Sequence, residues 1–185
     1  VRLEDRLVDR LAEAVAAVGE GPVYVLGRGS NTLVADAGFS GTVVHLGEGF
    51  ASMDFDPSSG IALLGGAADL PVAARRSVEA GLSGFEWAVG VPGSVGGAVR
   101  MNAGGHGSDM AATLVSVELL DLRSGERQVR EAAGLDLSYR SSSIKAHELV
   151  ISATLALSEG DPEKGRAELR EIVRWRREHQ PGGAN

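Results

Sequence analysis

Residues 23–36, VYVLGRGSNTLVAD, place five residues of low apolar character, Gly27–Asn31, between two apolar runs. Val23–Leu26 predicts a short buried strand, and Thr32–Ala35 predicts a second extended segment. The letters GRGSNT supply two glycines of a dinucleotide-binding fingerprint without the third, and no GK[ST] ending of a P-loop occurs in the chain. We therefore expect a tight turn between two extended segments.

Such a turn has two possible uses. Glycine permits positive φ and lets the backbone approach a ligand closely. Successive N–H groups can then converge on an anion such as a diphosphate, and Ser30 and Asn31 add side-chain donors. The alternative is a hairpin turn that holds no ligand, and this segment taken alone favours that alternative.

A second glycine-dense segment, GVPGSVGGAVRMNAGGHG at residues 90–107, favours the ligand-binding interpretation. Each glycine increases the entropy lost when a loop is ordered. This high number of glycines therefore indicates that the backbone must lie close to a ligand. Pro92 stiffens the approach, and Ser94 and Asn102 can bind a ligand or cap turns. The interleaved valines indicate a packed segment, although it shows no clear period and we expect mostly loop over residues 84–107.

The totals exclude several classes of function. The chain has 185 residues, enough for one domain or two small lobes, and its net charge of −7 argues against nucleic acid as a partner. It has no cysteine, which excludes disulfides, thiolate catalysis and cysteine-ligated zinc and favours a reducing compartment. We predict no metal site, no membrane segment and a cytoplasmic location, and nothing in the sequence indicates a protein partner.

Strands and helices alternate without a regular βαβ repeat, which predicts an α+β fold. Helices are expected at residues 2–18, from Asp69 to about residue 80, and from Asp161 to near the end; strands are expected at residues 42–46, 61–66, 113–122 and 148–157, with a hairpin turn at 123–126.

Four segments in order along the chain resemble the UDP-N-acetylenolpyruvoylglucosamine reductase (MurB) family. LGRGSNTLVADAGFSGTVVHL is similar to the first flavin loop of that family, and GLSGFEWAVGVPGSVGGAVRMNAGGHG is similar to its second. LSYRSSSIK, followed by LVISATLAL, resembles its tyrosine–arginine motif and the next strand, and EIVRWRREHQP resembles its linking helix. The resemblance spans nearly the whole chain.

The resemblance implies a two-lobe FAD-binding fold of the PCMH or vanillyl-alcohol-oxidase type, with the flavin between the lobes. It implies an FAD-dependent oxidoreductase in which NADPH supplies hydride, through FAD, to UDP-N-acetylglucosamine enolpyruvate, giving UDP-N-acetylmuramate for peptidoglycan synthesis. Arg140 matches the catalytic arginine, which would stabilise negative charge on the substrate enolate. The positions that match flavin-binding residues are Gly27, Arg28, Gly29, Ser30, Asn31, Thr32, Gly90, Pro92, Gly93, Ser94, Gly96, Gly97, Asn102, Ala103, Gly104 and Tyr139.

The resemblance also implies a domain division. We expect residues 1–50 to form the first FAD-binding lobe without its first strand, residues 51–160 the second lobe, and residues 161–185 a helix leading towards a substrate-binding domain that this sequence does not contain. That domain carries the serine proton donor of the family. We therefore expect the 185 residues to bind flavin at best and not to complete turnover.

The sequence departs from the family at Arg28, which can contact a phosphate or simply be solvated. Two other functions stay open. One is another flavin oxidase or dehydrogenase of the same two-lobe class. The other is a glycine-rich binding domain without enzymatic activity, for which the basic residues Arg170, Arg174, Arg176 and Arg177 would form a partner surface.

Overall fold

The computed structural model describes residues 10, 11, 13 and 21–180, so the predicted helix at residues 2–18 lies almost wholly outside the described residues. The strands are β1 (Val23–Val25), β2 (Thr42–Val44), β3 (Met53–Asp56), β4 (Ile61–Gly65), β5 (Leu82–Ser83), β6 (Gly104–Gly105), β7 (Ser108–Asp109), β8 (Leu114–Asp121), β9 (Arg127–Glu131), β10 (Glu148–Ala156) and β11 (Ser158–Glu159). The helices are α2 (Leu70–Glu79), α3 (Val95–Arg100) and α4 (Pro162–His179), with 3-10 turns η1 (Glu48–Phe50), η2 (Glu86–Gly90), η3 (Met110–Ala112) and η4 (Ala132–Gly134).

The centre of the fold is a five-stranded antiparallel sheet in the order β3-β4-β10-β8-β9. Strand β10 lies in its middle and is buried along most of its length, as its run of β-branched and apolar residues predicts. Strands β8 and β9 form the predicted hairpin, in which the Asp121 N–H donates to the Glu126 carbonyl at 2.9 Å. The two longest predicted strands are therefore confirmed.

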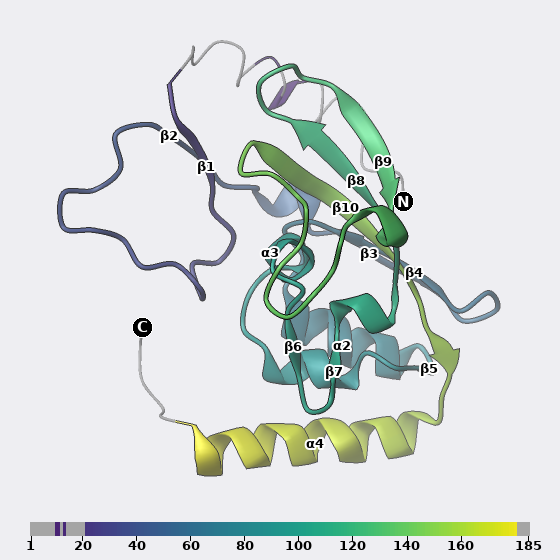
Figure 1. Cartoon of the computed structure of the whole chain (residues 1–185). Helices are drawn as coiled ribbons and strands as arrows, with labels where there is room; N and C mark the ends of the chain where they lie inside the picture. The colour runs from purple at the N-terminus through teal and green to yellow at the C-terminus, as the bar shows by residue number, and fades with distance from the viewer. Residues whose placement is uncertain (1–9, 12, 14–20, 181–185) are drawn as a thin grey trace.

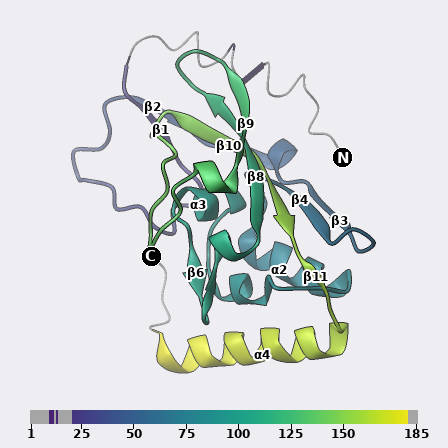
Figure 2. The ribbon, with the colours of Figure 1, turned by 45° about the vertical axis from the view of Figure 1, so that its right-hand side comes forward.

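Two helices below the sheet cover one side of the core (Figure 1). Helix α2 begins where Asp69 and Pro71 predict, because the Asp69 carboxylate accepts from the Val72 N–H at 3.0 Å. Helix α4 packs along α2 and η2, and in both views it lies on the far side of α2 from the sheet (Figures 1 and 2). A Cβ at Gly165 of α4 would lie 2.7 Å from a methyl carbon of Val78, so glycine permits this close approach.

A separate pair of parallel strands, β1 and β2, lies beside the sheet, with Val23 opposite Thr42. Its apolar side chains join a second hydrophobic cluster with residues of the sheet, including Leu120, Leu149 and Ile151. The predicted extended segment at Thr32–Ala35 is wrong: these residues form no strand, and Leu33 is 99% exposed. A short apolar run forms a strand only where a neighbouring strand or a core packs against it, and these residues have neither.

The prediction of mostly loop over residues 84–107 is also wrong in part. The segment folds into η2 and the short helix α3, and α3 packs on β10. Trp87 is buried and its ring meets Phe85 edge-on, with ring centroids 5.5 Å apart. The glycines obscure a helical pattern because they lower helix propensity, and here tertiary packing overrides that propensity.

Candidate functional site

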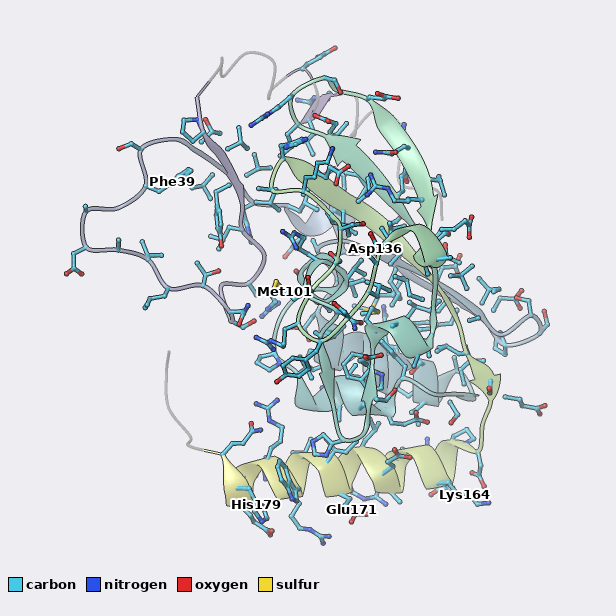
Figure 3. All side chains as sticks on the ribbon, in the orientation of Figure 1. Phe39, Met101, Asp136, Lys164, Glu171 and His179 are labelled. Atoms are coloured by element: carbon cyan, nitrogen blue, oxygen red, sulfur yellow. The ribbon has the colours of Figure 1, made fainter. Side chains whose placement is uncertain are left out.

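A cavity of about 540 Å³ separates the β1–β2 pair from the main sheet and α3. Its walls come from the end of β1, from the residues after β2, from α3 and from the start of β10. Met101, at the end of α3, lines it and is labelled in Figure 3. Of the residues predicted to bind flavin, those on its surface are Gly27, Arg28, Ser94, Gly96 and Gly97.

The first glycine segment leaves β1 and turns at the mouth of this cavity. The last bond to β2 runs from the Leu26 N–H to the Val44 carbonyl at 2.9 Å, and the Thr32 N–H then closes a turn on the Gly29 carbonyl at 3.2 Å. Gly29 has φ +74°, a conformation that an L side chain rarely adopts, and open space surrounds the position of a Cβ there. The predicted tight turn is therefore present, and most of its residues are half-buried.

The second glycine segment meets the first directly. The Ser30 hydroxyl donates to the Pro92 carbonyl at 2.9 Å, across 62 positions of sequence. A Cβ at Gly27 would lie 2.8 Å from Ser94 Oγ, and one at Gly93 would lie 3.0 Å from Ser30 Oγ. The two segments thus form one continuous wall, and side chains at Gly27 or Gly93 would push them apart.

Helix α3 sits close to the sheet because its first turn carries glycine. The Ser94 hydroxyl accepts from the Gly97 N–H at 3.3 Å and caps the helix. The Gly96 N–H donates to the Gly66 carbonyl at 2.9 Å, and a Cβ at Gly96 would lie 3.0 Å from that oxygen. This glycine is needed for close packing under the cavity floor.

The cavity carries charges of both signs. Arg28 Nη1 lies 2.9 Å from Asp69 Oδ2, so the guanidinium is neither freely solvated nor without a partner. Asp69 also caps α2 through its other oxygen, and the two roles fix the arginine at the mouth of the site. An arginine at this place can meet an anionic group of a ligand in the cavity.

On the opposite wall, Glu148 begins β10 and is buried. Its carboxylate accepts from the Lys145 N–H at 2.6 Å and from Arg130 Nη2 at 2.5 Å. Burial by itself would raise the pKa of Glu148, but these two partners outweigh it and hold the pKa below its ordinary value. Glu148 is therefore a carboxylate at neutral pH and ties the cavity wall to β9.

The predicted catalytic residue, Arg140, stands on a tight turn near the first glycine segment. Ser138 and Ser141 exchange two backbone hydrogen bonds, each 3.1 Å long, and Arg140 has φ +57°. Arg140 Nη2 donates to Asn31 Oδ1 at 2.7 Å, whereas Tyr139 is 93% exposed. The structure therefore brings Arg140 to the same loop that borders the cavity.

Other predicted positions lie away from the cavity surface. Gly90, Pro92 and Gly104 line a second, shallower hollow beside Trp175 of α4. Asn102 and Ala103 are buried. Among the residues that line the cavity, those that the sequence did not mark as site residues include Asp69, His45, Lys145 and Glu148. Asp69 had a visible signal only as a helix cap, and Glu148 only as the first residue of a strand.

The residues present fit a flavin dinucleotide. The cavity is within the usual range for ligand pockets, about 300–1,000 Å³. A Cβ at Gly27 would lie 2.8 Å from Ser94 Oγ, so this part of the wall requires glycine, which also lets a ligand approach the backbone closely. The positive charge of Arg28 lies at its mouth and suits a diphosphate.

Comparison with known proteins supports this fit. Residues 4–129 match the family described as FAD binding domain, which is more than half of the chain. The chain therefore belongs to the FAD binding domain family, and the predicted flavin cofactor and two-lobe fold class are confirmed.

Among the described residues no helix is long and apolar enough to cross a membrane.

Particular relatives are more specific. The chain is 44% identical over 160 residues to UDP-N-acetylenolpyruvoylglucosamine reductase of Paramagnetospirillum magneticum, covering 86% of this chain and 51% of that protein. The crystal structure of the reductase MurB from Thermus caldophilus matches with a TM-score of 0.78 and 35% identity, over 92% of this chain and 61% of that one. A berberine bridge enzyme in complex with (S)-reticuline matches with a TM-score of 0.60 at 17% identity, over 82% of this chain and 32% of that one, and shares the fold alone. The chain spans about half the length of the curated relatives it matches.

Proposed function

We propose that this chain is the FAD-binding part of a UDP-N-acetylenolpyruvoylglucosamine reductase. The observation that carries the proposal is the junction of three sequence-distant segments, where Ser30 contacts Pro92 and Arg140 contacts Asn31 beside one cavity. The relatives that match most of this chain carry that enzyme's name. The substrate is then UDP-N-acetylglucosamine enolpyruvate and the reductant is NADPH.

FAD, when bound, would supply the hydride-transfer chemistry between NADPH and the enolpyruvyl group. The chain's own residues would hold and orient the dinucleotide and stabilise charge on the substrate. The wall formed by residues 27–32 and 90–97 would hold the dinucleotide, with the guanidinium of Arg28 available to its diphosphate. The guanidinium of Arg140 would stabilise the negative charge that develops on the substrate enolate, because a fixed cation needs no reorganisation during the reaction.

The domain division belongs to the same proposal. Residues 1–50 and 51–160 would be the two lobes that flank the flavin, and residues 161–185 would lead towards a substrate domain. We assign substrate binding and the proton donor to the part of the longer relatives that this chain does not span. A cytoplasmic location fits a sequence without cysteine.

The test uses the full-length gene product. We expect it to oxidise NADPH only when UDP-N-acetylglucosamine enolpyruvate is present, and Arg140→Ala to lower kcat by about 100-fold or more while FAD stays bound. Oxidation of an alcohol or hydroxy acid instead of the UDP-sugar would replace the proposal with a flavin oxidase of the same fold. Protein that binds no flavin and reduces nothing would support a binding domain without activity.

A further inference from the structure

Arg140 is held at its charged end by a residue of a different segment. Its Nη2 donates to the side-chain oxygen of Asn31 at 2.7 Å, and the two residues are 109 positions apart. An amide oxygen is a neutral acceptor, so it orients the guanidinium without cancelling its charge, as a carboxylate would. The contact therefore leaves the full positive charge available to a second, anionic group.

Arg140 is also held through its backbone. The turn that carries it is closed by the paired Ser138 and Ser141, and the Ser138 carbonyl accepts from Asn102 Nδ2 at 3.0 Å. A left-handed backbone at φ +57° is uncommon for arginine and persists only where the surroundings determine it. The hydrogen bond from Asn102 is one such constraint.

Asn102 itself is fixed inside the protein. It is 5% exposed, its Nδ2 also donates to Asp109 Oδ2 at 3.2 Å, and its Oδ1 accepts from the Ala111 N–H at 2.9 Å. Both amide hydrogens and the amide oxygen have partners within the chain. Its side chain is thus engaged in holding the turn and its neighbours, although the residue lies in a segment that resembles a flavin loop.

We propose that Asn31 and Asn102 are positioning residues for Arg140, one acting on the guanidinium and the other on the backbone turn. This inference rests on the proposed function, in which Arg140 stabilises the enolate. Because each asparagine lies in a different glycine segment, correct folding of both segments would be required before the arginine is aimed. The flavin cradle and the reactive arginine would then be assembled together.

A double-mutant cycle in the full-length enzyme tests the role of Asn31. We expect Asn31→Ala to lower kcat by about 10- to 100-fold at saturating FAD, as a displaced catalytic group does. In an Arg140→Ala background the same substitution should change kcat by less than about twofold, because the effect passes through the arginine. Lys164→Ala, at the exposed start of α4 (Figure 3), is the control and should leave kcat unchanged.

Equal losses in both backgrounds would overturn the inference and make Asn31 an independent flavin contact. An unchanged kcat in Asn31→Ala would also overturn it. Asn102→Gly tests the second asparagine, because glycine accepts its φ of +40° while losing the side-chain bonds. We expect it to bind FAD and to lose kcat about 10-fold. An Asn102→Gly variant that does not fold would overturn the inference for Asn102, because its role would then be structural. A wild-type enzyme that is inactive on the UDP-sugar would contradict the proposed function instead.

Discussion

Gly29 and Gly96, one from each of the two glycine segments that meet at the cavity, are needed for opposite reasons. In the first, Gly29 lies at φ +74° with open space where a Cβ would be, and the chain around it has no regular structure. In the second, Gly96 lies in a helix and a Cβ there would press on the Gly66 carbonyl at 3.0 Å. One glycine permits a conformation and the other permits contact.

This difference separates binding from folding. A change in the first segment should alter what the cavity holds with a small effect on stability. A change in the second should alter stability first, because α3 packs directly on β10 in the core. The following substitutions test that separation.

The largest effect is expected at the packed glycine. Gly96→Val places atoms against the backbone of Gly66, which cannot move aside without shifting the sheet, so we expect a loss of about 3 kcal/mol or more in the free energy of unfolding. Urea denaturation followed by circular dichroism measures it. Gly21→Val is the control, since nothing lies within 4 Å of its Cβ position. Equal stability of the two variants would show that α3 is not tightly packed.

A second test of the packed core is Glu148→Gln at the start of β10, which breaks the buried pair with Arg130. We expect a loss of about 1–3 kcal/mol at pH 7. Because the folded pKa of Glu148 lies below its ordinary value of 4.5, its contribution is present above that value and disappears as pH falls through the folded pKa.

The difference in stability between wild type and Glu148→Gln should therefore shrink as the pH is lowered below 4.5 and through the folded pKa, as measured by thermal unfolding across pH. Glu126→Gln, at an exposed turn position, should show no such dependence. A gap that is constant with pH would mean that the carboxylate contributes nothing through its charge.

Gly29→Ala tests the first glycine segment, in which glycine permits a left-handed conformation. Alanine in the left-handed conformation costs roughly 1–2 kcal/mol of stability. We expect the loss of FAD binding free energy, measured by quenching of flavin fluorescence, to be larger than this cost. Gly38→Ala is a closely matched control, because Gly38 has φ +73° and open space but is remote in sequence from Gly27 and Arg28, which line the cavity next to Gly29. Equal loss of FAD affinity in both variants would mean that strain, and not the cradle, sets binding.

The smallest effect is expected from Asp69→Asn. Asparagine still caps α2, whereas the ion pair with Arg28 is lost, so stability should change little. Arg28 then carries an uncompensated charge, and FAD should bind a few-fold more tightly, with the gain shrinking as salt is added. Asp161→Asn, the equivalent cap of α4, should leave FAD affinity unchanged. Weaker FAD binding in Asp69→Asn would show that Arg28 must be paired to act.

Local chemistry made much of this molecule predictable. The caps Asp69 and Asp161 locate their helices, and the β-branched run of β10 identifies a buried central strand. These signals lie within a few residues of the feature they determine. The sequence did not predict the start of α3 because Gly96 and Gly97 disfavour helix, and the need for glycine at position 96 comes from the distant Gly66 and Val150.

The site was predictable in its backbone and less so in its side chains. Glycine patterns located one wall of the cavity, since φ and close approach restrict residue type locally. The pairing of Arg28 with Asp69, and of Arg140 with Asn31, depends on tertiary placement that no spacing encodes. The extended prediction for Thr32–Ala35 failed for the same reason, because a strand needs a neighbour.

The central claim is that the two glycine segments form one cradle for a flavin dinucleotide. The most direct measurement is a titration of the flavin-free chain with FAD, FMN and riboflavin, followed by flavin fluorescence. The account predicts saturable binding of one FAD per chain and much weaker binding of FMN, which lacks the adenosine monophosphate part, and of riboflavin, which lacks the adenosine diphosphate part. Failure to bind FAD, or equal affinity for all three flavins, would contradict it.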